Sequence, residues 1–128
     1  MLELNRISAG YGKQTVLDGI SVDFEKGKLT SIIGVNGCGK STLLKAILGI
    51  LSLSSGEIFI DGENLLTISR NEIAKKIAYL SQGKNIPDMT VEQMVLHGRF
   101  PYLSYPRRYS SHDREVAIKA MEAVGIAE

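Results

Sequence analysis

The stretch GVNGCGKST at 34–42 constrains the fold of this 128-residue chain more than any other part of the sequence. It fits the pattern G-x-x-x-x-G-K-[ST] without a gap. The residues before it, Leu29–Ile33, predict a strand, and the residues after it predict an amphipathic helix with the apolar face Leu43, Leu44, Ile47, Leu48 and Leu51. Because strand, loop and helix follow in this order, the pattern predicts a phosphate-binding loop rather than an ordinary glycine-rich turn.

Phosphate binding requires residues of these types. A triphosphate is well held by backbone N–H groups that a tight loop and a helix N-terminus direct toward it. Gly34, Gly37 and Gly39 permit the positive φ angles and close approach that such a loop needs. Lys40 adds a mobile charge for the β- and γ-phosphates, and the Ser41 hydroxyl is placed for Mg²⁺. The predicted nucleotide contacts in the loop are Asn36, Gly37, Cys38, Gly39, Lys40, Ser41 and Thr42.

Composition argues against several classes of function. Fifteen basic and 14 acidic residues leave a net charge of +1, so nothing indicates a nucleic-acid partner. A single cysteine rules out an internal disulfide and fits a reducing cytoplasm. The N-terminus does not read as a signal peptide, and no apolar stretch approaches the roughly 18 residues that span a bilayer. The length predicts one domain at most.

Short runs of alternating apolar and polar residues predict the first part of the fold. Residues 2–8 and 15–24 are predicted strands of a small antiparallel sheet. A hairpin turn at 25–28 is predicted to lead into the strand before the loop. Further short strands are predicted at 57–62 and 77–80.

Three later helices are predicted from their caps. The segments 69–76 and 90–97 both begin with residues that match a capping box. A last helix is predicted to start near Ser110 or Ser111 and to end at Gly125. Its predicted apolar face consists of Ala117, Ala120, Met121 and Val124.

The order and spacing of these segments resemble the ATP-binding subunit of an ABC transporter. The matching pieces are Tyr11, then GVNGCGKST, SGEIFIDGENL, IAYLSQ and MTVEQMVLHGRFPY. The last piece, with DREVAIKAMEAVGI after it, is most similar to the ATPases of iron–siderophore and cobalamin importers. The resemblance implies an α/β fold: a P-loop NTPase core of the ABC ATPase type, with an N-terminal antiparallel β subdomain and the start of the helical subdomain.

The resemblance covers nearly the whole chain but only the N-terminal part of the family's domain, which is therefore expected to be truncated here. Residues 1–82 would form the β subdomain and the core as far as the Q-loop. Residues 83–128 would form the Q-loop exit and part of the helical subdomain.

The family's functional roles carry over to individual positions. Tyr11 matches the aromatic residue that stacks on adenine, although a tyrosine there could instead pack the hairpin. Val16 matches a small apolar residue that touches the nucleotide. Gln82 matches the Q-loop glutamine, which reaches Mg²⁺ and the attacking water, so Lys40 and Gln82 are the candidate catalytic residues and Ser41 and Gln82 the candidate metal ligands.

Two further positions have competing interpretations. Cys38 is either a small residue that contributes only its amide, or a thiol activated by the helix N-terminus. The segment 99–102 (RFPY) either docks a membrane subunit or packs its aromatic side chains within the helical part.

The resemblance also implies partners and a location. The cofactors would be ATP and Mg²⁺, and the complete protein would pair with a second ATPase subunit in a homodimer. Transmembrane permease subunits would hold it at the cytoplasmic face of the cell membrane. The transported substrate would be an iron–siderophore or a related metal chelate.

Several of the family's motifs do not occur within these 128 residues. The sequence contains no LSGGQ-like signature, no apolar strand ending in Asp-Glu and no switch histidine. Since phosphoryl transfer depends on all these parts together, the chain alone is expected to bind nucleotide and to turn it over negligibly. An unpaired strand edge beside the loop is expected to favour self-association.

Two other functions remain open at this point. One is a soluble ABC-type ATPase that acts in translation or repair, and the other is a small-molecule kinase with the same phosphate loop. A dinucleotide-dependent dehydrogenase is disfavoured because the glycines run G-x-x-G-x-G rather than G-x-G-x-x-G.

Overall fold

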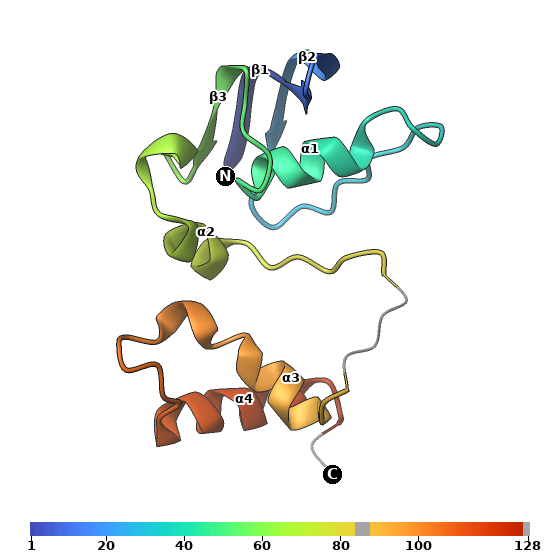
Figure 1. Cartoon of the computed structure of the whole chain (residues 1–128). Helices are drawn as coiled ribbons and strands as arrows, with labels where there is room; N and C mark the ends of the chain where they lie inside the picture. The colour runs from blue at the N-terminus through green and yellow to red at the C-terminus, as the bar shows by residue number, and fades with distance from the viewer. Residues whose placement is uncertain (84–87, 127–128) are drawn as a thin grey trace. The chain divides into compact units, whose positions relative to one another are not determined.

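A computed structural model of the chain describes residues 1–83 and 88–126 (Figure 1). The chain divides into two compact units, Met1–Ile77 and Ala78–Glu128. Within the described ranges, no helix combines the length and the hydropathy needed to cross a bilayer.

The first unit is built around an antiparallel sheet. Its strands are β1 (Leu2–Tyr11), β2 (Gln14–Phe24), β3 (Ser55–Ile60) and β4 (Glu63–Asn64), in the order β2-β1-β3-β4. β1 pairs antiparallel with both β2 and β3, so the predicted antiparallel opening of the chain is confirmed.

A bulge in β1 explains why the apolar spacing of this strand is irregular. The register with β2 shifts between Leu4 and Ile7. Between them Arg6 takes a positive φ of 46°, and its N–H donates to Ser21 Oγ at 2.9 Å. The inserted residue keeps Leu4, Ile7 and Ala9 on one face, where all three are completely buried.

Helix α1 (Lys40–Ile47) packs against the sheet beside β1 and β2 (Figure 1). Its residues Leu43, Ala46 and Ile47 join the buried strand residues in one apolar cluster. The predicted apolar face was wrong at Leu44, which is 37% exposed. A helix of eight residues buries a narrower apolar stripe than the predicted pattern. Ala46 lies in this buried stripe, and Leu44 lies outside it.

The predicted strands at 29–33 and 77–80 are not strands in this structure. The turn before the first of them forms, with Lys28 N–H donating to Glu25 O at 3.4 Å, but no strand follows it. A strand exists only when a neighbouring segment accepts its hydrogen bonds, and no described strand pairs with either run. Leu29 and Ile33 are consequently 98% and 92% exposed.

The helices predicted at 69–76, 90–97 and from Ser110 or Ser111 are confirmed, and the described residues also contain two 3₁₀ turns that were not predicted. In the first unit these are the 3₁₀ turn η1 (Leu65–Thr67) and α2 (Arg70–Lys76), whose N-cap Ser69 accepts a hydrogen bond from the Glu72 N–H. The second unit contains α3 (Val91–His97), η2 (Phe100–Tyr102) and α4 (Ser111–Ala123).

The second unit is held together by contacts between α3 and α4. Leu96 of α3 and Ala117 and Met121 of α4 are buried. Ala120 and Val124 are exposed, so the predicted apolar face of the last helix was only half right. The capping box predicted at the start of α3 is present with both of its hydrogen bonds.

Candidate functional site

The loop that precedes α1 depends on two glycines in the left-handed region. Gly37 has φ 83°, and Gly39, the N-cap of α1, has φ 98°. A Cβ atom at Gly39 would lie 3.2 Å from side-chain atoms of both Val16 and Leu17. Because Gly39 has no Cβ atom, the loop can pack directly against β2. Val16, a predicted contact residue, therefore lies beside the loop.

The first turn of α1 presents backbone donors that the helix itself does not use. The Leu43 N–H donates to Gly39 O at 2.8 Å, so the amides of residues 40–42 precede the first intrahelical bond. No described side chain caps this end, and the first turn contains no acidic residue. The Ser41 side chain is exposed there, whereas Thr42 is buried. This arrangement can accept an anion, since the positive end of the helix dipole is uncompensated.

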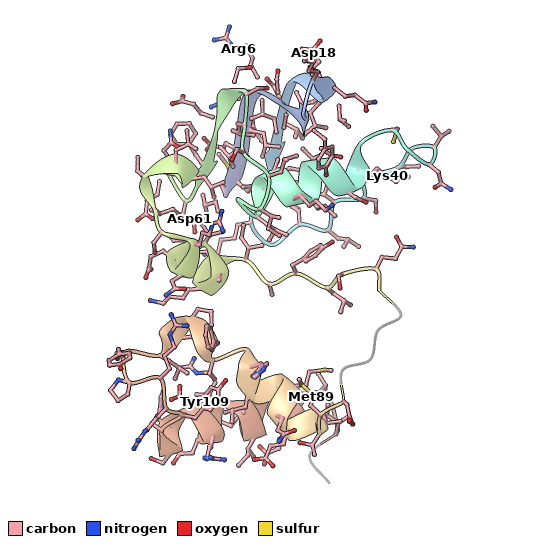
Figure 2. All side chains as sticks on the ribbon, in the orientation of Figure 1. Arg6, Asp18, Lys40, Asp61, Met89 and Tyr109 are labelled. Atoms are coloured by element: carbon pink, nitrogen blue, oxygen red, sulfur yellow. The ribbon has the colours of Figure 1, made fainter. Side chains whose placement is uncertain are left out.

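Lys40 brings a positive charge to the same loop (Figure 2). Its Nζ donates to Gly34 O at 2.7 Å and to Val35 O at 2.8 Å, and it lies 3.7 Å from Cys38 Sγ. Among the described residues, no carboxylate forms an ion pair with Lys40. The charge of this ammonium group is thus balanced only by neutral acceptors, which an anionic ligand can outcompete.

Tyr11 and Gln82, the two predicted contacts outside the loop and β2, have different surroundings. Tyr11 ends β1, is 47% exposed, and its hydroxyl lies 3.5 Å from Lys45 Nζ of α1. Gln82 belongs to the second unit and is exposed, and its role stays a prediction. The structure thus brings Val16 to the loop and links Tyr11 to α1.

Sequence reasoning missed two polar contacts. Lys45 lies in the predicted helix, and no local signal connects it to a tyrosine 34 positions earlier. Asp113, 6% exposed, accepts hydrogen bonds from the Ser110 N–H and hydroxyl and from Arg99 Nε. Its spacing from Ser110 is that of a capping box, a signal that the sequence does contain.

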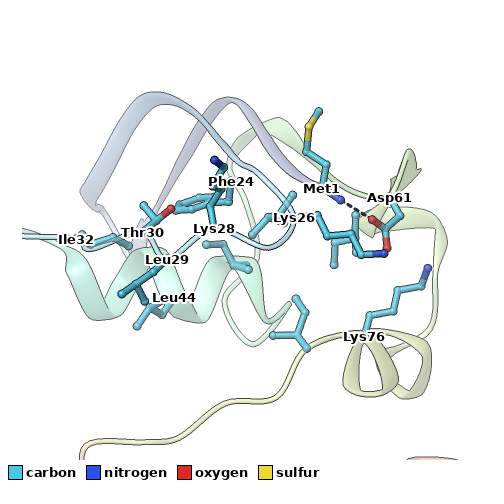
Figure 3. Close-up of a pocket in the computed structure, with 14 residues that line it drawn as sticks. Met1, Phe24, Lys26, Lys28, Leu29, Thr30, Ile32, Leu44, Asp61 and Lys76 are labelled. Atoms are coloured by element: carbon cyan, nitrogen blue, oxygen red, sulfur yellow. Dashed lines mark hydrogen bonds and ion pairs between the residues drawn. The ribbon is translucent and has the colours of Figure 1, made fainter.

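An apolar hollow of about 550 Å³ lies in the first unit (Figure 3). Its lining includes Phe24, Leu29 and Ile32, together with Leu44 of α1. Its lining includes none of the predicted contact residues. It adjoins the run 29–33, which no described strand covers.

Comparison with known proteins agrees with this fold. The ABC transporter family profile matches residues 17–128. The ferric enterobactin transport ATP-binding protein FepC of Escherichia coli is 38% identical over 94% of this chain, and the petrobactin import ATP-binding protein FpuD of Bacillus anthracis is 36% identical over 99%. The matches cover only 45% and 47% of those two proteins, so the chain spans about half their length.

Solved structures show the same architecture. A nucleotide-free ATP-binding cassette from an ABC transporter superposes with a TM-score of 0.83 and 25% identity, over 99% of this chain and 55% of that one. The ATP-binding cassette MJ0796, solved as a dimer bound to ADP and Pi, superposes with a TM-score of 0.73 at 22% identity, over 98% of this chain and 57% of that one. The family match over residues 17–128, together with this fold, shows that the chain belongs to the ABC transporter family, as part of its ATP-binding cassette.

Proposed function

We propose that the chain binds the phosphates of Mg·ATP as the nucleotide-binding part of an ABC importer ATPase. The observation that carries this proposal is the first turn of α1, where uncapped amides and the Lys40 ammonium converge on one loop. In a complex, the amides of residues 36–42 would donate to the phosphate oxygens, and Lys40 would exchange its two carbonyl partners for the β- and γ-phosphates.

The other contacts are assigned by the chemistry of their side chains. The exposed Ser41 hydroxyl and the Gln82 amide oxygen are suitable ligands for Mg²⁺. When bound, Mg²⁺ neutralises part of the triphosphate charge. Val16, beside Gly39, would contact the nucleotide, and Tyr11 would stack on the adenine. Lys40 and Gln82 are the residues that we assign to phosphoryl transfer.

The names of the relatives support a substrate class. They include transport ATP-binding proteins for ferric enterobactin, petrobactin and iron(3+)-hydroxamate. We therefore assign the complete protein to the import of an iron–siderophore or related metal chelate. It would act as a peripheral subunit at the cytoplasmic face of the membrane, with permease subunits and a second ATPase subunit, as the dimeric cassettes among its structural neighbours suggest.

The Lys40→Ala variant tests the nucleotide site. Hydrogen bonds to charged groups contribute roughly 1.5–3 kcal/mol, so we expect the variant to bind Mg·ATP at least about tenfold more weakly in a calorimetric titration. Lys28→Ala removes the same charge outside the loop and should bind as the wild type does. Equal affinity of the wild type and Lys40→Ala for ATP would contradict the proposal.

The transport assignment has its own test. When the chain is expressed as part of a full-length cassette, we expect that cassette to co-purify with a membrane permease. Purified alone, the 128 residues should show negligible ATP turnover, because the sequence lacks the signature and the catalytic carboxylates. Co-purification with ribosomes or DNA, or steady hydrolysis that Lys40→Ala abolishes, would contradict these assignments.

A further inference from the structure

Lys45 connects helix α1 to the tyrosine at the end of β1. Its Nζ lies 3.5 Å from the Tyr11 hydroxyl oxygen and 5.7 Å from the centroid of the ring. The ammonium group is therefore much nearer to the hydroxyl end of the ring than to its centre. A cation at this end leaves the π faces of Tyr11 open to another aromatic group, and the side chain is 47% exposed.

The same helix carries the proposed phosphate-binding turn and Lys45. The amides and the ammonium proposed to hold phosphate lie at the first turn of α1, and Lys45 lies five residues after Lys40. At 1.5 Å per residue this is about 7.5 Å along the helix axis. A ring anchored to Lys45 is thus held at a set distance from the phosphate-binding turn by a rigid element.

We propose that Lys45 is a positioning residue for the nucleobase, an inference that rests on the proposed ATP site. Its ammonium donates a hydrogen bond to the Tyr11 hydroxyl and so fixes the orientation of the ring before a base arrives. A preorganised ring loses less side-chain freedom when a base stacks on it, and this strengthens binding. Lys45 itself touches neither base nor phosphate.

A double-mutant cycle separates this role from a general effect of charge. Tyr11→Phe removes the hydroxyl and keeps the ring, whereas Lys45→Met removes the ammonium and keeps the length of the side chain. Both residues are exposed, so both variants should fold. Each should be titrated with Mg·ATP and with Mg·tripolyphosphate, which has no base, in about 0.15 M salt, where charges are screened over roughly 8 Å.

We expect each single variant to bind ATP roughly two- to tenfold more weakly, the range for one hydrogen bond. Tripolyphosphate binding should not change in either variant. The double variant should bind ATP no more weakly than the weaker single variant, because both substitutions remove the same interaction. Lys45→Arg, which keeps a donor at this position, should recover most of the ATP affinity.

Other outcomes would overturn the inference. Unchanged ATP binding in both single variants, losses that add in the double variant, or an equal loss for tripolyphosphate would each show that Lys45 does not act through Tyr11. In those cases Lys40→Ala should still bind both ATP and tripolyphosphate more weakly than the wild type does, and the proposed ATP site would stand. If the wild-type chain bound neither ligand, the proposed function and this inference would both fail.

Discussion

Lys40 illustrates how one side chain prepares a loop for an anion. Its two hydrogen bonds to Gly34 O and Val35 O tie the helix start to the beginning of the loop. The ammonium is therefore already close to the uncapped amides of α1. Because the side chain is already ordered, less conformational entropy is lost when an anion binds.

Two glycines of the loop should respond differently to alanine. At Gly39 a Cβ would be strained by φ 98° and would crowd Val16 and Leu17 at 3.2 Å, so Gly39→Ala should lower the free energy of unfolding by about 1–2 kcal/mol or more and weaken ATP binding. At Gly34 the atom that a Cβ would crowd, among the residues that the structure describes, is Cys38 Sγ at 2.6 Å, which can rotate away. Urea unfolding compares them, and equal losses would contradict this account of the loop.

Cys38 offers a chemical probe of the same loop. It is an exposed free cysteine whose Sγ lies 3.7 Å from Lys40 Nζ. Alkylation would add bulk between the amides, so we expect it to block ATP binding, and excess Mg·ATP should slow the alkylation. Mass spectrometry measures the rate of labelling. A rate that is independent of ATP would place Cys38 outside the nucleotide site.

At the scale of elements, the start of α4 depends on one carboxylate. Asp113 accepts hydrogen bonds from the Ser110 hydroxyl and N–H and from Arg99 Nε, which precedes η2. The two hydrogen bonds from Ser110 have the largest effect and the bond from Arg99 the next largest, and together they lower the pKa of Asp113 from 3.8 to about 2. The carboxylate thus caps α4 and ties it to the segment that follows α3.

This lowered pKa predicts how the second unit responds to acid. Because the folded pKa lies below the unfolded value, the stabilisation is fully present above about pH 5 and is lost as the pH falls toward 2. Thermal unfolding followed from pH 7 to pH 2.5 should show this loss in the wild type. In Asp113→Asn the same part of the profile should be flatter, and identical profiles for the two proteins would contradict the role of Asp113.

At the scale of the whole molecule, the run 29–33 leaves apolar side chains uncovered. Leu29, which lines the apolar hollow, and Ile33 are almost fully exposed. Exposed apolar segments with unpaired backbone groups favour association. We expect the 128-residue chain to form dimers or larger species as its concentration rises.

Sedimentation velocity tests this association. Lys substitutions at both Leu29 and Ile33 should keep the chain monomeric at concentrations where the wild type associates. The matched control places Lys at Ile50 and Leu66, which are 62% and 69% exposed elsewhere in the first unit, and should leave association unchanged. A wild-type chain that stays monomeric at high concentration would contradict the prediction.

The elements that were predicted correctly are those that local interactions specify. The helix at 90–97 has its hydrogen-bonded cap within four residues, and the antiparallel sheet follows from alternation and short turns. The run 29–33 was wrongly predicted as a strand because a strand requires a partner from elsewhere in the chain. The Lys45–Tyr11 contact was missed for a related reason: it joins residues 34 positions apart, which no local pattern records.

The most direct test of the nucleotide site is a two-dimensional NMR spectrum of the ¹⁵N-labelled chain titrated with Mg·ATP. We expect the largest amide shifts on Gly39, Lys40 and Ser41, at the uncapped first turn of α1. These shifts should disappear in Lys40→Ala at the same ATP concentration. If a large excess of Mg·ATP left the amide signals of 36–42 unchanged, this loop would not hold the phosphates.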